Sequence, residues 1–180
     1  EEYVREMNLA AVKLARDLAD EYTAKNPDKP RFVAGSVGPT NKTCSMSPDV
    51  NNPAYRALSY DELAASYQQQ MEAMLEGGVD AILIETIFDT LNAKAAIFAA
   101  EQAMKMTGIE VPIMLSVTVS DIGGRTLSGQ TLDAFLASVQ HANIFSVGLN
   151  CSFGARQLKP FLEQLASRAP YYTVSYTHLR

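Results

Sequence analysis

The apolar residues follow two alternating patterns along the chain: helical spacing of three and four residues, and short unbroken apolar runs. The first helical stretch begins near Val4 and is broken by the segment 26–30, because proline lacks a backbone donor and restricts the residue before it. Its apolar positions form one stripe, of the kind that a surface helix turns toward the core. The members of this stripe are Val4, Met7, Ala11, Leu14 and Leu18.

A regular alternation of strands and helices follows. A capping box at Ser59 and Glu62 predicts the start of the second helix, and the pair Gly77-Gly78 predicts its end. Later apolar runs predict strands, and the periodic stretches between them predict helices. The predicted strands are 32–37, 79–84, 111–117, 144–149 and 171–174, and the later helices cover about 89–107, 132–139 and 158–165.

This alternation predicts an α/β fold with a parallel sheet. Two architectures satisfy it. A five-stranded open doubly wound sheet would be complete at this length, whereas a (β/α)8 barrel typically needs about 250 residues, so the chain would be part of one. Periodicity does not choose between them, but both place chemistry at the carboxyl ends of the strands. The polar loop over residues 40–58 is long, and loops of this length are usually functional or disordered instead of simple connections.

Composition excludes several classes of protein. With 47% hydrophobic residues the chain can bury a core, which excludes intrinsic disorder. The net charge of −5 argues against a nucleic-acid or polybasic membrane surface, and no apolar run is long enough to span a bilayer. Two cysteines are too few for a disulfide scaffold. We therefore expect a soluble, cytoplasmic protein.

Glu85 is the sharpest candidate for chemistry, because a carboxylate directly after an apolar strand lies near a low-dielectric core and needs a partner. It could bind a substrate ammonium, act as a base or ligate a metal. The alternative is a structural glutamate favoured by the dipole of the following helix. The residues alone leave these alternatives equally open.

Cys151 follows the fourth strand and has two interpretations. A cysteine in this position is more often a small hydrophobic residue, but a thiolate facing a cleft would be a nucleophile or a ligand for a soft metal. No CxxC pair is present, and neither histidine has ligand spacing to a cysteine. Cys44, in the polar loop, is interpreted as incidental.

The strand-end segments together resemble a known family. GSVGPTNKT with SPDVNNPAYR, ILIETIFDTLNAKAA, SVTVSDIGGRTLSGQT and GLNCSFG are similar to the homocysteine-binding domain of cobalamin-dependent methionine synthases. GLNC alone would indicate the wider zinc-dependent homocysteine S-methyltransferase family, which includes betaine–homocysteine methyltransferases. The PTNKT and RTLSGQT loops look specific to the cobalamin-dependent branch.

The resemblance implies an incomplete (β/α)8 TIM barrel, whose strands here would be the third to the seventh. It covers residues 1–172, which we expect to be a partial homocysteine-binding barrel domain. The segment 173–180 departs from the Pro-Asn-Ala-Gly-type loop of the family. We expect this segment to be a non-native tail, and we set it aside in functional reasoning.

The resemblance also implies a site. Cys151 stands where the family has the first of three cysteines that hold zinc, and the other two have no counterpart here. Glu85 stands where the family binds the ammonium of homocysteine, and Ser116 and Thr118 would line the same pocket. The implied reaction is attack of a zinc-bound homocysteine thiolate on the methyl group of methylcobalamin, giving methionine. The cobalamin and a folate would be bound by other domains of the full-length chain.

Three alternatives remain at this point. A homocysteine methyltransferase that uses betaine or S-methylmethionine would share the barrel. An aldolase or lyase would need a Schiff-base lysine or a metal-binding cluster at the strand ends, and we find neither. The third is a truncated, non-catalytic fragment, which we expect of the isolated 180 residues, because an unclosed barrel leaves strand edges unpaired.

Overall fold

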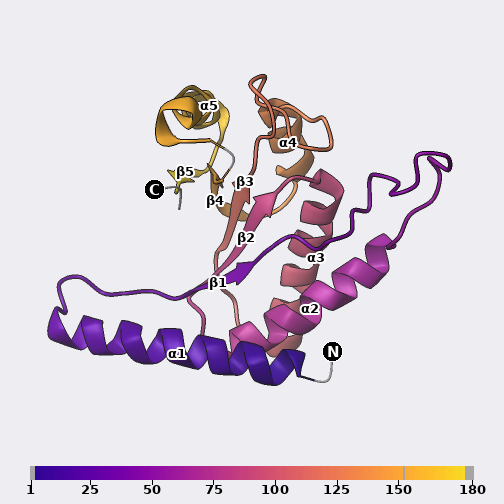
Figure 1. Cartoon of the computed structure of the whole chain (residues 1–180). Helices are drawn as coiled ribbons and strands as arrows, with labels where there is room; N and C mark the ends of the chain where they lie inside the picture. The colour runs from indigo at the N-terminus through magenta and orange to yellow at the C-terminus, as the bar shows by residue number, and fades with distance from the viewer. Residues whose placement is uncertain (1–2, 152, 177–180) are drawn as a thin grey trace.

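The computed structural model describes residues 3–151 and 153–176. Five helices and five strands alternate through this part of the chain, as the pattern of apolar residues predicts (Figure 1). In chain order they are α1 (Val4–Lys25), β1 (Ala34–Val37), α2 (Tyr60–Gly77), β2 (Ala81–Ile87), α3 (Thr90–Thr107), β3 (Ile113–Val117), α4 (Leu132–Val139), β4 (Ile144–Leu149), α5 (Ala155–Arg168) and β5 (Tyr172–Ser175).

The strands form one parallel sheet in the order β1-β2-β3-β4-β5. The parallel α/β architecture is therefore confirmed. The boundary predicted between residues 172 and 173 falls inside β5, where Thr173 pairs with Val147 of β4. The origin of the segment 173–180 stays a prediction, and residues 177–180 lie outside the described part of the chain.

The helices begin at side chains that satisfy their first backbone donors. Ser59 Oγ accepts from the backbone N of Glu62, whose carboxylate accepts from the backbone N of Ser59 at 2.9 Å, so the predicted capping box is confirmed. Asp89 caps α3 by accepting from the backbone N of Leu91 and of Asn92. A cap of this kind stabilises a helix by about 1 kcal/mol.

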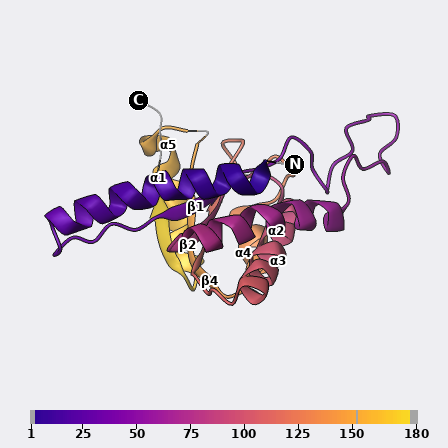
Figure 2. The ribbon, with the colours of Figure 1, turned by 90° about the horizontal axis from the view of Figure 1, so that it is seen from below.

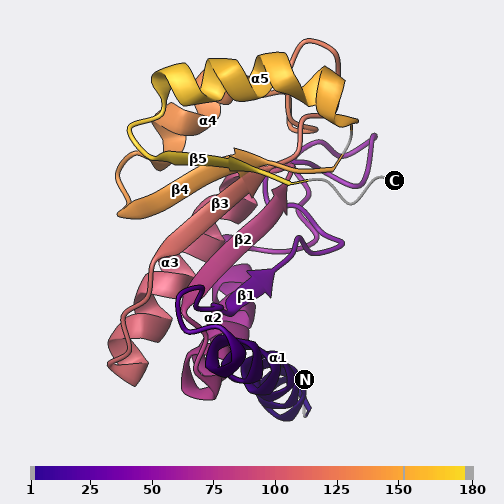
Figure 3. The ribbon, with the colours of Figure 1, turned by 90° about the vertical axis from the view of Figure 1, so that its left-hand side faces the viewer.

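The core lies between the sheet and its covering helices, of which α2, α3 and α4 lie behind the sheet in Figure 3. Leu158 and Leu165 of α5 belong to the same core. Alternate strand residues such as Val37, Ile84 and Leu115 are buried on that side. The opposite face carries residues that are more exposed, among them Ser36 and Glu85. In the described residues, no helix has both the length and the apolar character that a membrane span requires.

The position of α1 corrects one expectation. The helix is present, but Met7, Leu14 and Leu18 of the predicted core-facing stripe are 68%, 69% and 57% exposed. The physical reason is that α1 packs on α2 through its other side, where Val12 touches the backbone of Gly77 so closely that a Cβ there would lie 2.9 Å from its side chain. Figure 2 shows the two helices alongside each other.

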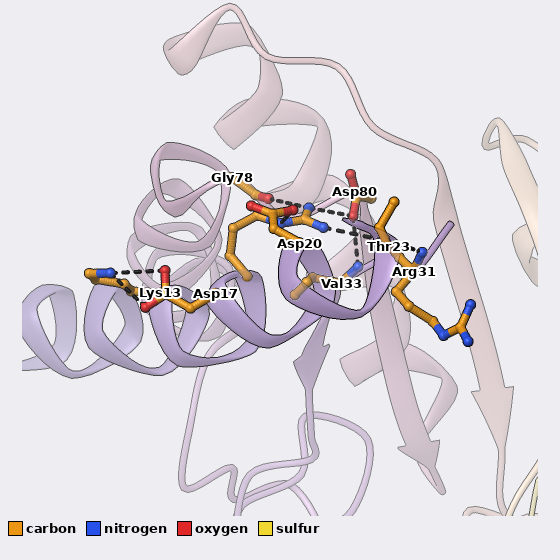
Figure 4. A network of polar contacts seen from close by, with 9 residues as sticks. Lys13, Asp17, Asp20, Thr23, Arg31, Val33, Gly78 and Asp80 are labelled. Atoms are coloured by element: carbon orange, nitrogen blue, oxygen red, sulfur yellow. Dashed lines mark hydrogen bonds and ion pairs between the residues drawn. The ribbon is translucent and has the colours of Figure 1, made fainter. Parts of the chain in front are cut away.

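A polar network attaches α1 and the chain after it to the sheet (Figure 4). Asp80, just before β2, accepts from Nη1 of Arg16 at 2.7 Å and from the backbone N of Val33 at 2.7 Å. Burial raises the pKa of Asp80, but the hydrogen bonds from Val33 and Arg16 outweigh it, and the net pKa is lowered. The network therefore fixes the start of β2 with an ionised carboxylate.

Candidate functional site

Glu85 lies at the carboxyl edge of the sheet with both carboxylate oxygens hydrogen-bonded. The Ser36 hydroxyl, from β1, donates to Oε1. The hydroxyl of Tyr176, just after β5, donates to Oε2 at 2.5 Å. The sheet therefore brings three strand ends together around one half-buried carboxylate.

A β-bulge places Glu85 within β2 instead of after it, where the sequence pattern predicts it. The pairing of β2 with β3 runs through Ile84 with Leu115 and then skips to Ile87 with Val117, so β2 has one extra residue. The next residue, Thr86, has φ of 55°, in the left-handed region. A residue other than glycine has a conformational cost of about 1–3 kcal/mol in that region. Bulges of this kind re-aim side chains next to functional sites.

Cys151 lies at the same edge, directly after β4 and the buried Asn150. It is a half-buried free cysteine with φ of 59°. Its sulfur accepts a hydrogen bond of 3.1 Å from Nδ2 of Asn150. The side chain is therefore held at the sheet edge instead of being packed in the hydrophobic core.

Asn150 joins these groups, and the sequence analysis did not single it out. The residue is 1% exposed. Its Oδ1 accepts from the backbone N of Thr86 at 3.3 Å and from the Ser116 hydroxyl at 2.7 Å. Its Nδ2 donates to Oγ1 of Thr86 at 2.8 Å as well as to the sulfur of Cys151. The only signal in the sequence was its place at the end of the fourth strand.

Ser116 and Thr118 lie at this edge as the strand pattern predicts, and both contact Asn150. Ser116 is 1% exposed and donates to the Asn150 side chain. Thr118 is half-buried and donates from Oγ1 to the Asn150 backbone carbonyl at 3.2 Å. Their hydroxyls therefore support Asn150, and their contact with a substrate stays a prediction.

Tyr176 is a second site residue that the sequence analysis missed, because it falls in the segment set aside as a tail. Burial raises the pKa of its phenol, and the hydrogen bond to Glu85 raises the pKa further. The phenol therefore stays protonated near neutral pH and can donate to the carboxylate. Extending the last predicted strand by two residues would have placed Tyr176 at the sheet edge.

The described residues contain no group of three or more His, Cys, Asp and Glu side chains that could hold a metal ion. Cys44 is not part of the sheet edge. It is buried, its backbone N donates to Oδ1 of Asn92 at 2.8 Å, and burial raises the pKa of its thiol. The described residues therefore do not complete a metal site around Cys151.

A separate hollow of about 1250 Å³ lies at the opposite end of the sheet. It is lined by residues where β3, β4 and β5 begin, including Ile113, Ile144 and Tyr172. None of the candidate site residues lines it. Chemistry in parallel α/β folds lies at the carboxyl ends of the strands, so we assign the candidate site to the edge that holds Glu85.

Comparison with known proteins gives a consistent result. A family model described as homocysteine S-methyltransferase matches residues 1–179. The homocysteine methyltransferase MmuM from Escherichia coli has a similar structure in three forms. The apo form has a TM-score of 0.76 at 22% identity, and the metallated form has 0.77 at 22%. The oxidised form has 0.67 at 21% identity.

The matched MmuM chains are longer than this chain. Each covers 96% of this chain, but the chain spans only 60% of the apo MmuM chain, 58% of the metallated one and 66% of the oxidised one. At this level of identity the likeness concerns the fold. The expected fold class, part of a TIM-type α/β barrel with five parallel strands in the described chain, is confirmed.

Proposed function

Because this chain belongs to the homocysteine S-methyltransferase family, we propose that it forms part of an enzyme that transfers a methyl group to the sulfur of homocysteine. The observation that carries this proposal is the placement of Glu85 and Cys151 at one sheet edge, joined through Thr86 and Asn150. A carboxylate and a sulfur are the groups needed for the two ends of an amino-acid thiol.

Glu85 is the proposed partner of the homocysteine ammonium. Its oxygens accept from the neutral hydroxyls of Ser36 and Tyr176, and no ion pair joins it to a Lys, Arg or His among the described residues. These hydroxyls orient the carboxylate without neutralising its charge. A half-buried carboxylate of this kind favours a cationic partner, and fixing the ammonium would orient the substrate.

Cys151 is the proposed sulfur ligand of a zinc ion. A free thiol has a pKa near 8.5 and is mostly protonated at neutral pH, whereas zinc keeps a coordinated thiol as the nucleophilic thiolate. The remaining ligands would come from residues beyond those described here, as the family pattern implies. We therefore expect the isolated 180 residues to bind zinc weakly and to transfer no methyl group.

Methylcobalamin is the proposed methyl donor, and the complete protein would then also carry cobalamin- and folate-binding domains. The support is the resemblance of the loops PTNKT and RTLSGQT to the cobalamin-dependent branch. The second candidate is a homocysteine methyltransferase that uses a small donor such as betaine or S-methylmethionine. The support for this alternative is the motif GLNC, which alone indicates the wider family.

A methyl-transfer assay on the complete protein that carries this sequence tests both candidates. Methionine formation from homocysteine would be measured with methylcobalamin, betaine or S-methylmethionine as the donor. We expect turnover with methylcobalamin, and turnover only with a small donor would support the second candidate. The variant Cys151→Ala should lose turnover and retain its fold, and the matched control Cys44→Ala should retain turnover. Full activity of Cys151→Ala would contradict the proposed role of that sulfur.

A further inference from the structure

We infer that Asn150 is a positioning residue that sets the separation between Glu85 and Cys151 and thereby selects homocysteine over the shorter amino-acid thiol cysteine. This inference rests on the proposed function, because it concerns how the two ends of the same substrate are held. Asn150 acts through its neighbours and does not itself touch the substrate.

The first observation is that the Asn150 amide bridges the two sides of the site. On one side it donates from Nδ2 to Oγ1 of Thr86 at 2.8 Å and accepts at Oδ1 from the Thr86 backbone N at 3.3 Å. On the other side Nδ2 donates to the sulfur of Cys151 at 3.1 Å. Thr86 directly follows Glu85, so the planar Asn150 amide connects β2, which carries Glu85, to the sulfur of Cys151.

The second observation is that the amide is fully used. A side-chain amide has two N–H donors and one oxygen with two lone pairs. Its two donor contacts reach Thr86 and Cys151, and its two acceptor contacts come from Thr86 and Ser116. A substrate atom could bond to this amide only by displacing one of these partners. The geometry therefore favours a supporting role over direct binding.

The third observation is the backbone of the two residues that Asn150 holds. In the described part of the chain, Thr86 and Cys151 are the non-glycine residues with positive φ, at 55° and 59°. Such conformations persist only where the surrounding structure over-determines them, and they cluster at functional sites. One buried side chain contacts both, so the two strained positions are coupled through Asn150.

A fixed separation between two anchors discriminates by the length of the substrate. Homocysteine has one methylene more than cysteine between the carbon that carries the ammonium and the sulfur. With the ammonium on Glu85, cysteine would not bring its sulfur to the position that homocysteine reaches. Recognition of one methylene is usually worth about 10–200-fold in specificity. Loss of the contacts that the Asn150 amide makes with Thr86 and Cys151 should therefore lower the selectivity for homocysteine over cysteine more than it lowers kcat.

The test measures kcat and KM for homocysteine and the inhibition constant of cysteine in the complete protein that carries this sequence. Thr86→Val removes the Oγ1 acceptor and keeps the β-branched shape, and Asn150→Ala removes the whole amide. The control Thr107→Val makes the same change at the end of α3, where Oγ1 bonds to a helix carbonyl. Ser36→Ala provides a second reference, because it removes a hydroxyl from Glu85 without touching the bridge.

We expect Thr86→Val to lower the preference for homocysteine over cysteine by about ten-fold or more, mainly through KM and the cysteine inhibition constant. Thr107→Val should leave the preference unchanged. An unchanged preference in Thr86→Val would overturn the inference, even if Asn150→Ala fails to fold. Equal weakening of homocysteine binding and cysteine binding in Thr86→Val would overturn it as well. Glu85→Gln and Cys151→Ala separate the two levels. If both lose function as proposed while the preference of Thr86→Val is unchanged, only the role of Asn150 is refuted. Normal homocysteine turnover in both would refute the proposed function together with the inference.

Discussion

The hydroxyl of Tyr176 donates a hydrogen bond of 2.5 Å to Oε2 of Glu85, across a separation of 91 residues in the sequence. The contact joins the end of β5 to β2, although β3 and β4 lie between them in the sheet. This cross-sheet contact is consistent with the curvature of a barrel wall. Because burial and the Glu85 contact raise the pKa of the phenol, the donor keeps its proton near neutral pH.

The variant Tyr176→Phe should remove one of the two hydrogen bonds that orient the Glu85 carboxylate and leave most of the sheet intact. A hydrogen bond to a charged group contributes about 1.5–3 kcal/mol, so we expect KM for homocysteine in the complete protein to rise by about ten-fold with a smaller change in kcat. Steady-state kinetics would measure both KM and kcat. Tyr172→Phe, at an exposed position of the preceding strand β5, is the matched control. Identical kinetics in the wild type and Tyr176→Phe would show that the Tyr176 phenol has no role in the site.

Glu85→Gln keeps the shape of the side chain and removes its charge. We expect homocysteine binding to weaken by about ten-fold or more, because a partly buried ion pair loses its anionic partner. Isothermal titration of homocysteine into the complete protein would measure the affinity. Glu110→Gln, at an exposed position before β3, is the control. Unchanged affinity in Glu85→Gln would remove this residue from the proposed pocket.

Tyr67 predicts how stability changes at alkaline pH. The side chain is 5% exposed, its hydroxyl donates to the Gly38 carbonyl at 3.3 Å, and burial raises its pKa from 10 to about 12. A raised folded-state pKa gives stability that is present below pH 10 and is lost as the pH rises toward 12. Two pKa units correspond to about 2–3 kcal/mol at most.

Tyr67→Phe should therefore make the free energy of unfolding less dependent on pH between 10 and 12. Denaturant titrations of the 180-residue chain at pH 8, 10 and 12 would measure this. The hydrogen bond lost in the variant lowers stability by about 1 kcal/mol below pH 10. Equal slopes with pH in the wild type and Tyr67→Phe would show that Tyr67 does not titrate on unfolding.

The exposed apolar stripe of α1 predicts self-association of the 180-residue chain. Contiguous exposed apolar surface of this kind favours association or aggregation. The stripe has helical spacing and comprises Met7, Leu14, Leu18 and Tyr22 of α1 together with Tyr3 just before it, each more than half exposed. The double variant Leu14→Lys, Leu18→Lys should therefore shift the chain toward the monomer, as measured by sedimentation velocity.

The control for this prediction adds the same two charges elsewhere. Ser66→Lys and Gln69→Lys lie at exposed positions of α2, so they reproduce the added charge without removing apolar surface. We expect this control to associate like the wild type. Equal association of both double variants and the wild type would exclude the α1 stripe as the cause.

Local sequence signals predicted the fold well. Ser59, Glu62 and Asp89 satisfy the first backbone donors of α2 and α3, and unbroken apolar runs produce the strands, so these elements depend on residues close in sequence. The exposed side of α1 could not be predicted in the same way. Periodicity shows that a stripe exists, but not which element lies against it, and Val12 with Gly77 decided the packing.

The candidate site was only partly predictable for a related reason. Glu85 and Cys151 follow apolar runs, so the parallel-sheet rule alone places them at one edge. The role of Asn150 depends on hydrogen bonds that reach β2 and β3 from the end of β4, and no spacing in the sequence encodes such convergence. Tyr176 was missed because it lies in the segment set aside as a tail, after the last predicted strand residue Val174. Its backbone N nevertheless donates to the Leu149 carbonyl of β4.

The central claim is that the sulfur of Cys151 is a zinc ligand in a site that also takes the homocysteine sulfur. Zinc K-edge X-ray absorption of the complete protein, with and without homocysteine, tests it most directly. In the wild type we predict one additional sulfur neighbour when homocysteine is added. In Cys151→Ser the zinc should have one sulfur neighbour fewer than in the wild type. The same sulfur coordination number in Cys151→Ser and the wild type would contradict the account.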